Sequence, residues 1–318
     1  MKFVDFTECE LFNRAYDGLS GAKLSILYHD EPYLLKFPKN LKKNPMKNIL
    51  KSYSDAPICE YLGSHVYANL GIPVHQTILG RHGKKLVVAC KDFCKQGDIL
   101  QEFFKLKTTM EPPFMDEQGN YTDGQGTEFD EVLKVISEHR RLKDKPEVCE
   151  RFWDMLIVDS LIGNGDRNNG NWGIILRYDG SEELAPVYDN GAAFNNKWDD
   201  QKIMRAMEDE NNLRTLAYKG ITCAYVRKGK DTNPFHILQR SDDEVCLKEL
   251  HRLIPKIIQT QPAFVQMVNE LRTENILSQA QADFFKKLVD LRIREAFIPI
   301  YKNKFKDQLI IPTREEEK

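Results

Sequence analysis

Asp166, Asn171 and Asp189 carry oxygen atoms in an order and spacing that suit one kind of chemistry. Asn171 follows Asp166 by five residues, and Asp189 comes after a short predicted hairpin. Mg²⁺ prefers hard oxygen ligands such as Asp and Asn, and it neutralises charge on a phosphoryl group in transit. The spacing therefore predicts phosphoryl transfer, in which Asp166 accepts or orients the proton of an acceptor hydroxyl while Asn171 and Asp189 hold the metal.

The segment around Asp166, GNGDRNNGN at 163–171, also has the composition of a polar turn, because Gly, Asn and Asp favour turns for backbone reasons. A polar turn alone does not explain the predicted elements on either side of this segment. A helix-like apolar run at 152–162 precedes it, a strand-like run at 172–176 follows it, and a second short strand leads to Asp189. We therefore favour a functional site over a plain turn.

Lys36 is the candidate cation for this chemistry. Strands are predicted at 22–27 and 33–37, joined by the turn YHDEP, so Lys36 lies inside the second strand among apolar neighbours. A buried ammonium without a partner is costly, and the phosphates of ATP would supply a partner. The alternative is a lysine on an edge strand that points to solvent.

A glycine-bearing loop, GLSGAK, precedes the first of these strands and contains Ser20, Gly21, Ala22 and Lys23. Backbone N–H groups in such a loop can approach phosphates, although an isolated G-x-x-G also fits a simple turn. We take these four residues as candidate contacts to ATP.

Glu60 is the candidate acid that orients Lys36. A helix is predicted at 58–70, because the Gly-Ile-Pro sequence that follows is a helix-stop signature. A solvated glutamate on a helix face remains an equal alternative.

The segment ACKDF at 89–93 follows two further predicted strands and is the candidate hinge between two lobes. In this position Cys90 and Asp92 would offer backbone N–H and C=O groups to the adenine of ATP, and Leu35 and Val88 would offer apolar cover.

The remainder of the chain is predicted to be mostly helical. Apolar residues recur at helical spacing in 242–259, 262–271 and 278–297, whereas 106–127 lack periodicity and indicate a loop or insertion. The predicted fold class is α+β with two lobes. Its parts are a small β-rich lobe at 1–92, a linker with a loop insertion at 93–127, and a larger helical lobe at 128–318.

Composition excludes some classes of function. The 318 residues carry a net charge of −2, which argues against nucleic acid as a direct partner because phosphate backbones are usually bound by a basic excess. No apolar run of about eighteen residues and no signal-peptide pattern is visible, so the default compartment is the cytoplasm. The seven cysteines are scattered and odd in number, and no disulfide framework is expected.

Five segments, taken in order, resemble the HipA-like serine/threonine kinases of bacteria: YLLKFP, NLGIPV, KLVVACKDF, LIGNGDRNNGNWGI and PVYDNGAAF. The resemblance implies a bilobed protein-kinase-like fold, ATP and Mg²⁺ as cofactors, and a protein Ser or Thr hydroxyl as acceptor. It matches Asp166 to the catalytic aspartate, Asn171 and Asp189 to the Mg²⁺ ligands, and Lys36 to the ATP-phosphate lysine. Ser20 falls where family members have a serine that becomes phosphorylated, which implies that the chain phosphorylates itself at Ser20.

Two departures from the family limit what is carried over. Longer members have an extra amino-terminal subdomain before the nucleotide loop, whereas this loop starts at Gly18, so no antitoxin-like or DNA partner is inferred. The family often has His at the position of Asn168, so no substrate-specific role is given to that residue.

Two other functions remain open. The pattern D-R-x-x-x-N-W followed by D-N-G-x-A-F is also similar to phosphoinositide 4-kinases, so a lipid headgroup or a small molecule is the alternative acceptor. No cysteine-rich palmitoylation patch is visible, which favours a protein kinase. The second alternative is a nucleotide-binding pseudokinase that recognises partners, against which the presence of Lys36, Asp166, Asn171 and Asp189 argues.

Overall fold

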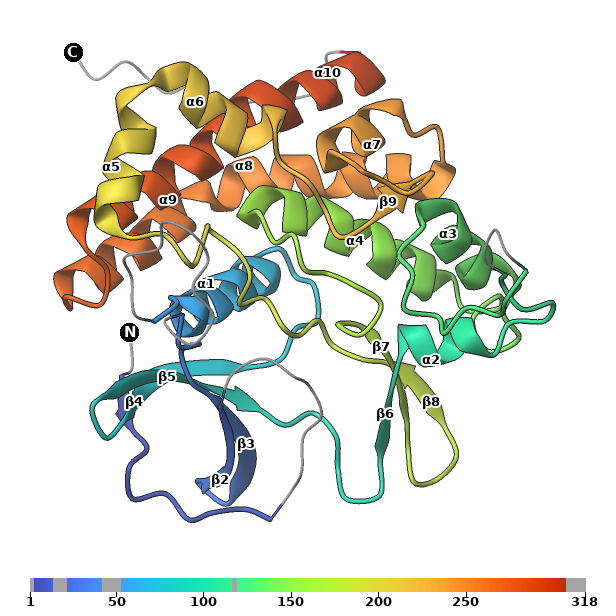
Figure 1. Ribbon diagram of the computed structural model, residues 1–318, viewed down its shortest axis with the longest axis horizontal. Coiled ribbons are helices and arrows are strands. Elements are labelled where there is room, and N and C mark those ends of the chain that lie inside the picture. The colour runs from blue at the N-terminus through green and yellow to red at the C-terminus, as the bar shows by residue number, and fades with distance from the viewer. Residues whose placement is uncertain (1–2, 14–21, 42–52, 116–118, 307–318) are drawn as a thin grey trace.

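The computed structural model describes residues 3–13, 22–41, 53–115 and 119–306. Within these ranges a curled β-sheet forms the amino-terminal part and helices dominate the carboxy-terminal part (Figure 1). The α+β fold class predicted from the sequence is confirmed. The predicted ATP contacts Ser20 and Gly21 lie outside the described residues.

In the described chain, the amino-terminal sheet has the strand order β1-β4-β5-β3-β2. Its strands are β1 (Val4–Asp5), β2 (Lys23–Tyr28), β3 (Glu31–Lys36), β4 (Thr77–His82) and β5 (Lys85–Lys91). His29 and Asp30 join β2 to β3 with φ angles of 52° and 62°, as a tight hairpin turn requires. Because β3 lies between β2 and β5, Lys36 is on an interior strand and the edge-strand alternative is wrong.

The two faces of this sheet have different roles. A small hydrophobic core covers the outer face and is made of Phe6, Ile26, Tyr33, Leu35, Val87 and Ala89. Side chains alternate along a strand, so Lys36 and its cross-strand neighbour Val88 point to the inner face, where Val88 joins the main core. The predicted apolar cover of adenine by Leu35 is therefore wrong.

Helix α1 (Ala56–Asn69) packs against β4 and β5 and lies between the sheet and the remaining helices (Figure 1). Pro57 occupies its first turn, where a missing N–H group is tolerated, and Gly71 follows its end with a φ angle of 77°. Glu60 lies on this helix as predicted. Only 1% of Glu60 is exposed, so the solvated alternative is wrong.

A second sheet of the described chain has the order β6-β7-β8 and lies beside the first. Its strands are β6 (Ile99–Glu102), β7 (Gly173–Leu176) and β8 (Glu182–Leu184). The sequence did not predict β6, which pairs with β7 and so ties the stretch after the predicted hinge to the strand that follows Asn171. The predicted loop at 106–127 also starts too early, because α2 (Phe103–Thr108) continues directly from β6.

Helix α4 (Pro146–Ile162) carries the apolar run predicted at 152–162 and is buried along that run. The other elements of the carboxy-terminal part are α3 (Phe129–Glu138), α5 (Asp200–Glu208), α6 (Glu210–Arg214), η1 (Thr215–Lys219), β9 (Val226–Arg227), β10 (Lys230–Asp231), α7 (Pro234–Arg240), α8 (Glu244–Thr273), α9 (Gln279–Arg292), η2 (Ile293–Phe297) and α10 (Ile298–Phe305). Among the described residues, no helix combines the length and apolar character needed to cross a membrane.

Helix α8 corrects the prediction of two separate helices at 242–259 and 262–271. It is one continuous helix that contains Pro255 and Pro262. Proline removes a backbone donor from a helix interior, but both prolines are exposed here, so water can satisfy the carbonyl groups that lose their partners.

Candidate active site

Lys36 joins the two parts of the chain at the candidate site. Its Nζ lies 2.8 Å from Asp189 Oδ1 and 3.0 Å from Glu60 Oε2. Burial disfavours the ammonium, but the Asp189 and Glu60 carboxylates outweigh burial and place the pKa of Lys36 well above its ordinary value. Burial likewise opposes the Glu60 charge, yet Lys36 keeps the pKa of that carboxyl below its usual range. A lysine that stays charged is suited to binding phosphate.

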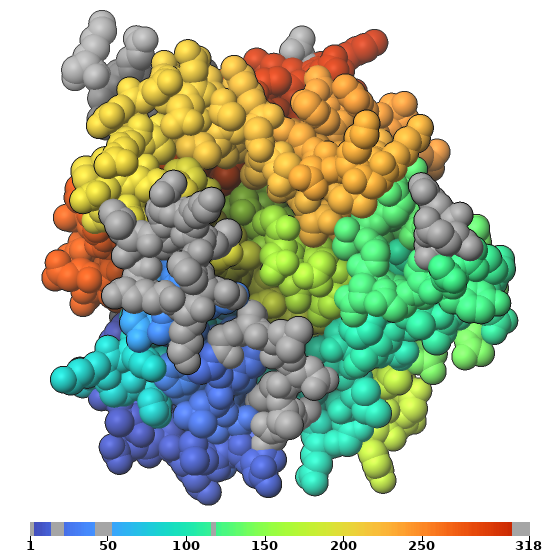
Figure 2. Space-filling view, viewed as in Figure 1, coloured from blue at the N-terminus to red at the C-terminus, as the bar shows by residue number. Residues whose placement is uncertain are grey.

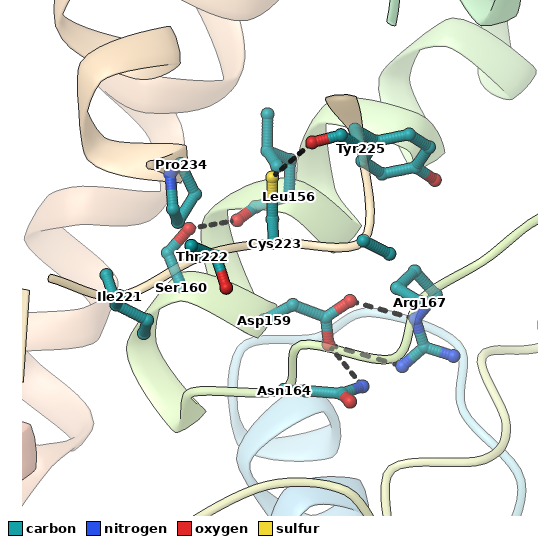
Figure 3. Close-up of a pocket in the computed structure, with 11 residues that line it drawn as sticks. Leu156, Asp159, Ser160, Asn164, Arg167, Ile221, Thr222, Cys223, Tyr225 and Pro234 are labelled. Carbon is teal, nitrogen blue, oxygen red and sulfur yellow. Dashed lines mark hydrogen bonds and ion pairs between the residues drawn. The ribbon is translucent and has the colours of Figure 1, made fainter. Parts of the chain in front are cut away.

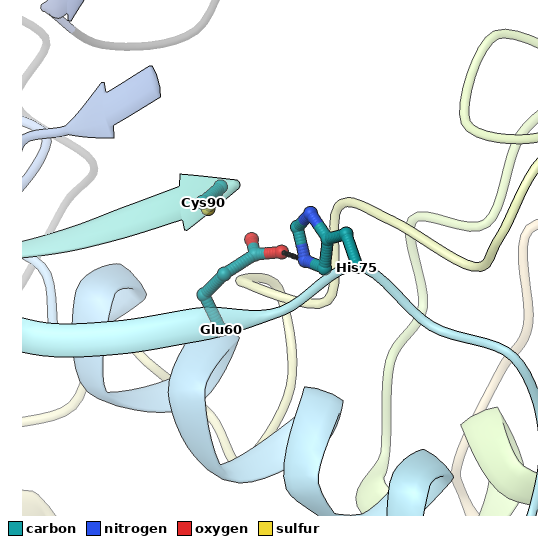
Figure 4. A group of neighbouring side chains, drawn as sticks. All are labelled: Glu60, His75 and Cys90. Carbon is teal, nitrogen blue, oxygen red and sulfur yellow. Dashed lines mark ion pairs between the residues drawn. The ribbon is translucent and has the colours of Figure 1, made fainter. Parts of the chain in front are cut away.

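The Glu60 carboxylate is held from its other side as well. Its Oε1 accepts a hydrogen bond from the Asn190 N–H at 3.0 Å and lies 2.9 Å from His75 Nε2. Cys90 completes the group, since its sulfur and the donor atoms of Glu60 and His75 lie within 4.8 Å of one another (Figure 4). Because protein groups occupy both oxygens of Glu60, this cluster positions the carboxylate and is not a ready metal site.

The loop that carries Asp166 begins where α4 ends. Gly163 has a φ angle of 71°, and a Cβ atom there would lie 2.6 Å from Arg292 Nη2, so this turn requires glycine. Asn168 Nδ2 donates to Asp166 Oδ1 at 3.1 Å. Asn171 Nδ2 donates to the backbone oxygen of Asp166 at 2.6 Å, and the Asn171 Oδ1 atom is the one that can take a metal.

The electrostatic environment of Asp166 suits a proton acceptor. Partial loss of hydration raises the pKa of Asp166, and the Asp189 carboxylate raises it further. The hydrogen bond from Asn168 and the positive charges of Lys197 and Arg167 oppose this rise in part. A carboxylate with a raised pKa accepts a proton more readily than an ordinary aspartate does.

Arg167 follows Asp166 but points away from it into the interior. It is 2% exposed, and its Nε donates to Asp159 Oδ2 at 2.8 Å. Asn164 Nδ2 donates to the other oxygen of Asp159 at 3.1 Å. Figure 3 shows Asp159, Asn164 and Arg167 together at a small cavity. The loop is therefore anchored from behind by a buried ion pair.

The same guanidinium also fixes the segment that carries Asp189. Arg167 Nη1 donates to the backbone oxygens of Asn171 and Tyr188, and its Nη2 donates to Asn190 Oδ1. Asp189 lies between two of these contacts with a φ angle of 60°, a left-handed conformation that aspartate tolerates better than most residues do. Arg167 thus sets the position of Asp189 relative to Asn171.

Lys36, Asp166 and Asp189 line one cleft with a volume of about 510 Å³. Its lining is formed by Lys23, Lys36, Phe37, Lys39, Ser54, Ala56, Pro57, Glu60, Asp166, Asp189, Gly191, Ala192, Asn195, Asn196, Lys197 and Trp198. In the space-filling view the lime-to-yellow part of the chain is visible between the blue sheet region and the orange helices (Figure 2). The lysines of this cleft can bind phosphates, and its carboxylate and amide oxygens can bind a hard cation. The lining therefore fits ATP with Mg²⁺.

The structure brings most predicted site residues together at this cleft. Lys23, Lys36, Glu60, Asp166 and Asp189 line it, and Asn171 is hydrogen-bonded beside Asp166. Ala22 is exposed just before β2, and its backbone oxygen accepts a hydrogen bond from Phe37 at 3.1 Å.

The predicted hinge residues are placed differently. The Asp92 N–H donates to the Pro32 carbonyl oxygen at 2.9 Å, and the Asp92 carboxylate accepts from the Cys94 N–H at 2.9 Å. Cys90 is buried beside Glu60, and this burial raises the pKa of its thiol. Among the described residues that line the cleft, neither Cys90 nor Asp92 is found.

Four residues that support the site were not predicted from the sequence: His75, Asp159, Arg167 and Asn190. Arg167 and Asn190 directly follow Asp166 and Asp189, so their adjacency was an available signal. No sequence pattern marks His75 or Asp159, because each is recruited only by the packing of α1 and α4.

Solved structures with the same architecture include a kinase. The crystal structure of the proinflammatory kinase CtkA of Helicobacter pylori superimposes with a TM-score of 0.84 and 28% identity, covering 97% of this chain and 99% of that chain. A chain of the HipA, HipB and operator DNA complex of Shewanella oneidensis matches with a TM-score of 0.51 and 13% identity, covering 90% of this chain and 68% of that chain. The first match confirms the bilobed kinase-like fold, and the second is a likeness of fold alone.

Sequence comparisons agree with this likeness. The model of the HipA-like C-terminal domain matches residues 19–260. The serine/threonine-protein kinase CtkA of Helicobacter pylori strain J99 is 31% identical over 261 residues, which cover 81% of this chain and 76% of the relative. The resemblance expected from the sequence is confirmed, and the chain belongs to the HipA-like C-terminal domain family.

Proposed function

We propose that this chain is an ATP- and Mg²⁺-dependent serine/threonine protein kinase that phosphorylates protein substrates and itself. The observation that carries the proposal is the pairing of Lys36 with both Glu60 and Asp189 at a cleft that also contains Asp166. The name of the CtkA relative supports the same activity. When bound, ATP supplies the transferable phosphoryl group and Mg²⁺ neutralises its charge.

Each site residue has its own role in the proposed reaction. Asp166 orients the acceptor hydroxyl and takes its proton, and its raised pKa suits that role. Asn171 and Asp189 hold Mg²⁺. Lys36 binds the phosphates, and Glu60 positions Lys36.

We further propose the roles of the remaining parts of the chain. The nucleotide-binding lobe spans 1–92, the linker and insertion span 93–127, and the catalytic lobe spans 128–318. The loop with Ser20, Gly21, Ala22 and Lys23 covers the phosphates, and the adenine lies near the segment with Cys90 and Asp92. The Asp92 N–H already donates to the Pro32 carbonyl oxygen, so the adenine would be bound by other backbone groups of this segment.

Intact mass and phosphosite mapping after incubation with ATP and Mg²⁺ test the proposal. We expect the wild type to gain phosphate on Ser or Thr and the Asp166→Asn variant to gain none, since the amide cannot accept the proton. Phosphate on Ser20 would establish the predicted autophosphorylation site, whose added charge would repel the phosphates of a second ATP. Phosphate only at other positions would overturn that site but not the kinase.

The Asp189→Asn variant tests the metal assignment. It keeps the shape of the side chain but removes the charge, so we expect binding of ADP to lose its dependence on Mg²⁺ while the melting temperature stays close to that of the wild type. Full activity in this variant would contradict the assignment. If the wild type transfers phosphate to phosphoinositide vesicles but not to protein, the acceptor is a lipid; if it binds ADP but transfers nothing, the chain is a pseudokinase.

A further inference from the structure

The catalytic loop contains no cation that can reach a transferring phosphoryl group. Arg167 is the one cationic residue between Asp166 and Asn171 in the sequence. Its guanidinium is buried and bound to Asp159 and to backbone oxygens behind the loop. Charge on the three equatorial oxygens of a phosphoryl group in transit is commonly met by Lys or Arg side chains in addition to metal.

Lys197 is a second cation that belongs to the same cleft. It is half-buried and lines the cleft together with Asp166 and Asp189. Within the part of the chain that the structure describes, it forms no hydrogen bond or ion pair. Lys36, by comparison, already binds two carboxylates.

The backbone around Lys197 is fixed on both sides. The Asn196 backbone oxygen accepts a hydrogen bond from the Asp55 N–H at 2.7 Å, which ties this segment to the start of α1. The Trp198 N–H donates to the Asn195 backbone oxygen at 2.9 Å, and the Asn196 side chain donates to the Gly191 backbone oxygen. These hydrogen bonds fix the point on the cleft wall from which the Lys197 side chain extends.

We infer that Lys197 contacts the transferring γ-phosphoryl group and stabilises its charge during transfer. This inference rests on the proposed kinase function. In the step, a bond forms from the acceptor oxygen to the γ-phosphorus and the bond from that phosphorus to the bridging oxygen breaks, with the electron pair leaving on ADP. The hydroxyl proton passes to Asp166, and Lys197 remains protonated throughout.

Single-turnover transfer from γ-labelled ATP to the chain itself, and calorimetric binding of ADP with Mg²⁺, test the inference on the full chain. For Lys197→Ala we expect the transfer rate to fall about 100-fold, the size seen when one such donor is lost, while ADP affinity stays within about twofold because ADP lacks the γ-phosphoryl group. Lys197→Arg should recover part of the rate. Lys248→Ala is the matched control, since the Lys248 side chain is 61% exposed and is not among the residues that line the cleft.

Each outcome decides the matter. A loss of rate with retained ADP affinity and an unchanged melting temperature supports the role. A rate equal to that of Lys248→Ala overturns it and leaves the kinase proposal standing. An equal loss of ADP affinity also overturns it, because Lys197 would then hold the α- or β-phosphate. A wild type that transfers no phosphate overturns the proposed function and this inference together.

Discussion

Arg167 and Lys36 are both cations held by carboxylates, but they face opposite sides of the site. The Arg167 side chain is 2% exposed and its ion-pair partner, Asp159, is 4% exposed. The Lys36 side chain is 19% exposed, and one of its partners, Asp189, is 38% exposed. Arg167 is thus enclosed by the protein, whereas Lys36 meets the cleft.

This difference separates the architecture of the site from its chemistry. No ligand can replace the partners of Arg167, so its contacts fix how the two loops lie relative to each other. The ion pair between Lys36 and Asp189 can be replaced by contacts to ligands. A phosphate can bind the lysine, and a metal ion can bind the carboxylate. A similar pairing of charges is therefore permanent in one place and exchangeable in the other.

The largest expected effect is the loss of folding stability in Arg167→Ala. Removing one partner of a buried pair leaves the other charge uncompensated and typically costs about 3–5 kcal/mol, here at Asp159. Urea unfolding measures this change. The control is Arg81→Ala, whose pair with Asp5 is exposed at 60% and 46% and should cost less than about 1 kcal/mol. Equal losses in the two variants would show that Arg167 is not the structural cation.

Lys36→Met should instead affect activity more than stability. We expect the rate of phosphoryl transfer to fall about 100- to 1000-fold, with a smaller loss of unfolding free energy than in Arg167→Ala, because His75 and Asn190 still hold Glu60. Transfer assays and urea unfolding on the same preparation separate the two effects. Lys248→Met removes an ion-paired lysine that is 61% exposed, and should change neither quantity appreciably.

A smaller effect is expected when the support of Glu60 is removed. His75→Ala should lower the transfer rate about tenfold, because a modest displacement of positioned groups is enough to slow a reaction that depends on geometry. His236→Ala, on the exposed surface of α7, is the matched control. If His75→Ala keeps the full rate, Lys36 is positioned without His75.

The smallest expected effect is a change in the folding stability caused by the negative charge of Asp166. The folded-state pKa of Asp166 is raised. The protonated Asp166 side chain therefore stabilises the folded state below the unfolded-state pKa, and this stabilisation is lost as pH rises through the folded-state pKa. Asp166→Asn is neutral at every pH. At pH 7 we therefore expect its melting temperature to exceed that of the wild type by on the order of 1 °C, with the difference vanishing in acid. A lower melting temperature at pH 7 would contradict the raised pKa.

Much of the fold was predictable because its signals are local. The strands around Lys36, the stop after α1 at Gly71 and the apolar run of α4 each follow from composition and turn residues within a short window. Prediction failed where tertiary context decides. The two exposed prolines of α8 read as a break but are tolerated by solvent, and β6 exists because β7 offers it an edge.

The candidate site, like the fold, was predictable where its signals are local. The positions of Asp166, Asn171 and Asp189 follow from spacing, and Lys36 from its apolar surroundings. The alternation of side chains along β3 places Leu35 on the face opposite to Lys36, so this local rule already excludes Leu35 as adenine cover. His75 could not be found, because its role depends on a loop and a helix meeting in space.

The contact of Lys36 with Asp189 spans 153 positions of the chain. Contacts between such distant residues close a long loop, and they form only after that entropic cost can be repaid by other packing. A chain that has emerged only as far as β7 contains Lys36 and Asp166 but still lacks Asp189. Any ligand that needs all three groups therefore finds no complete site on a nascent or half-folded chain.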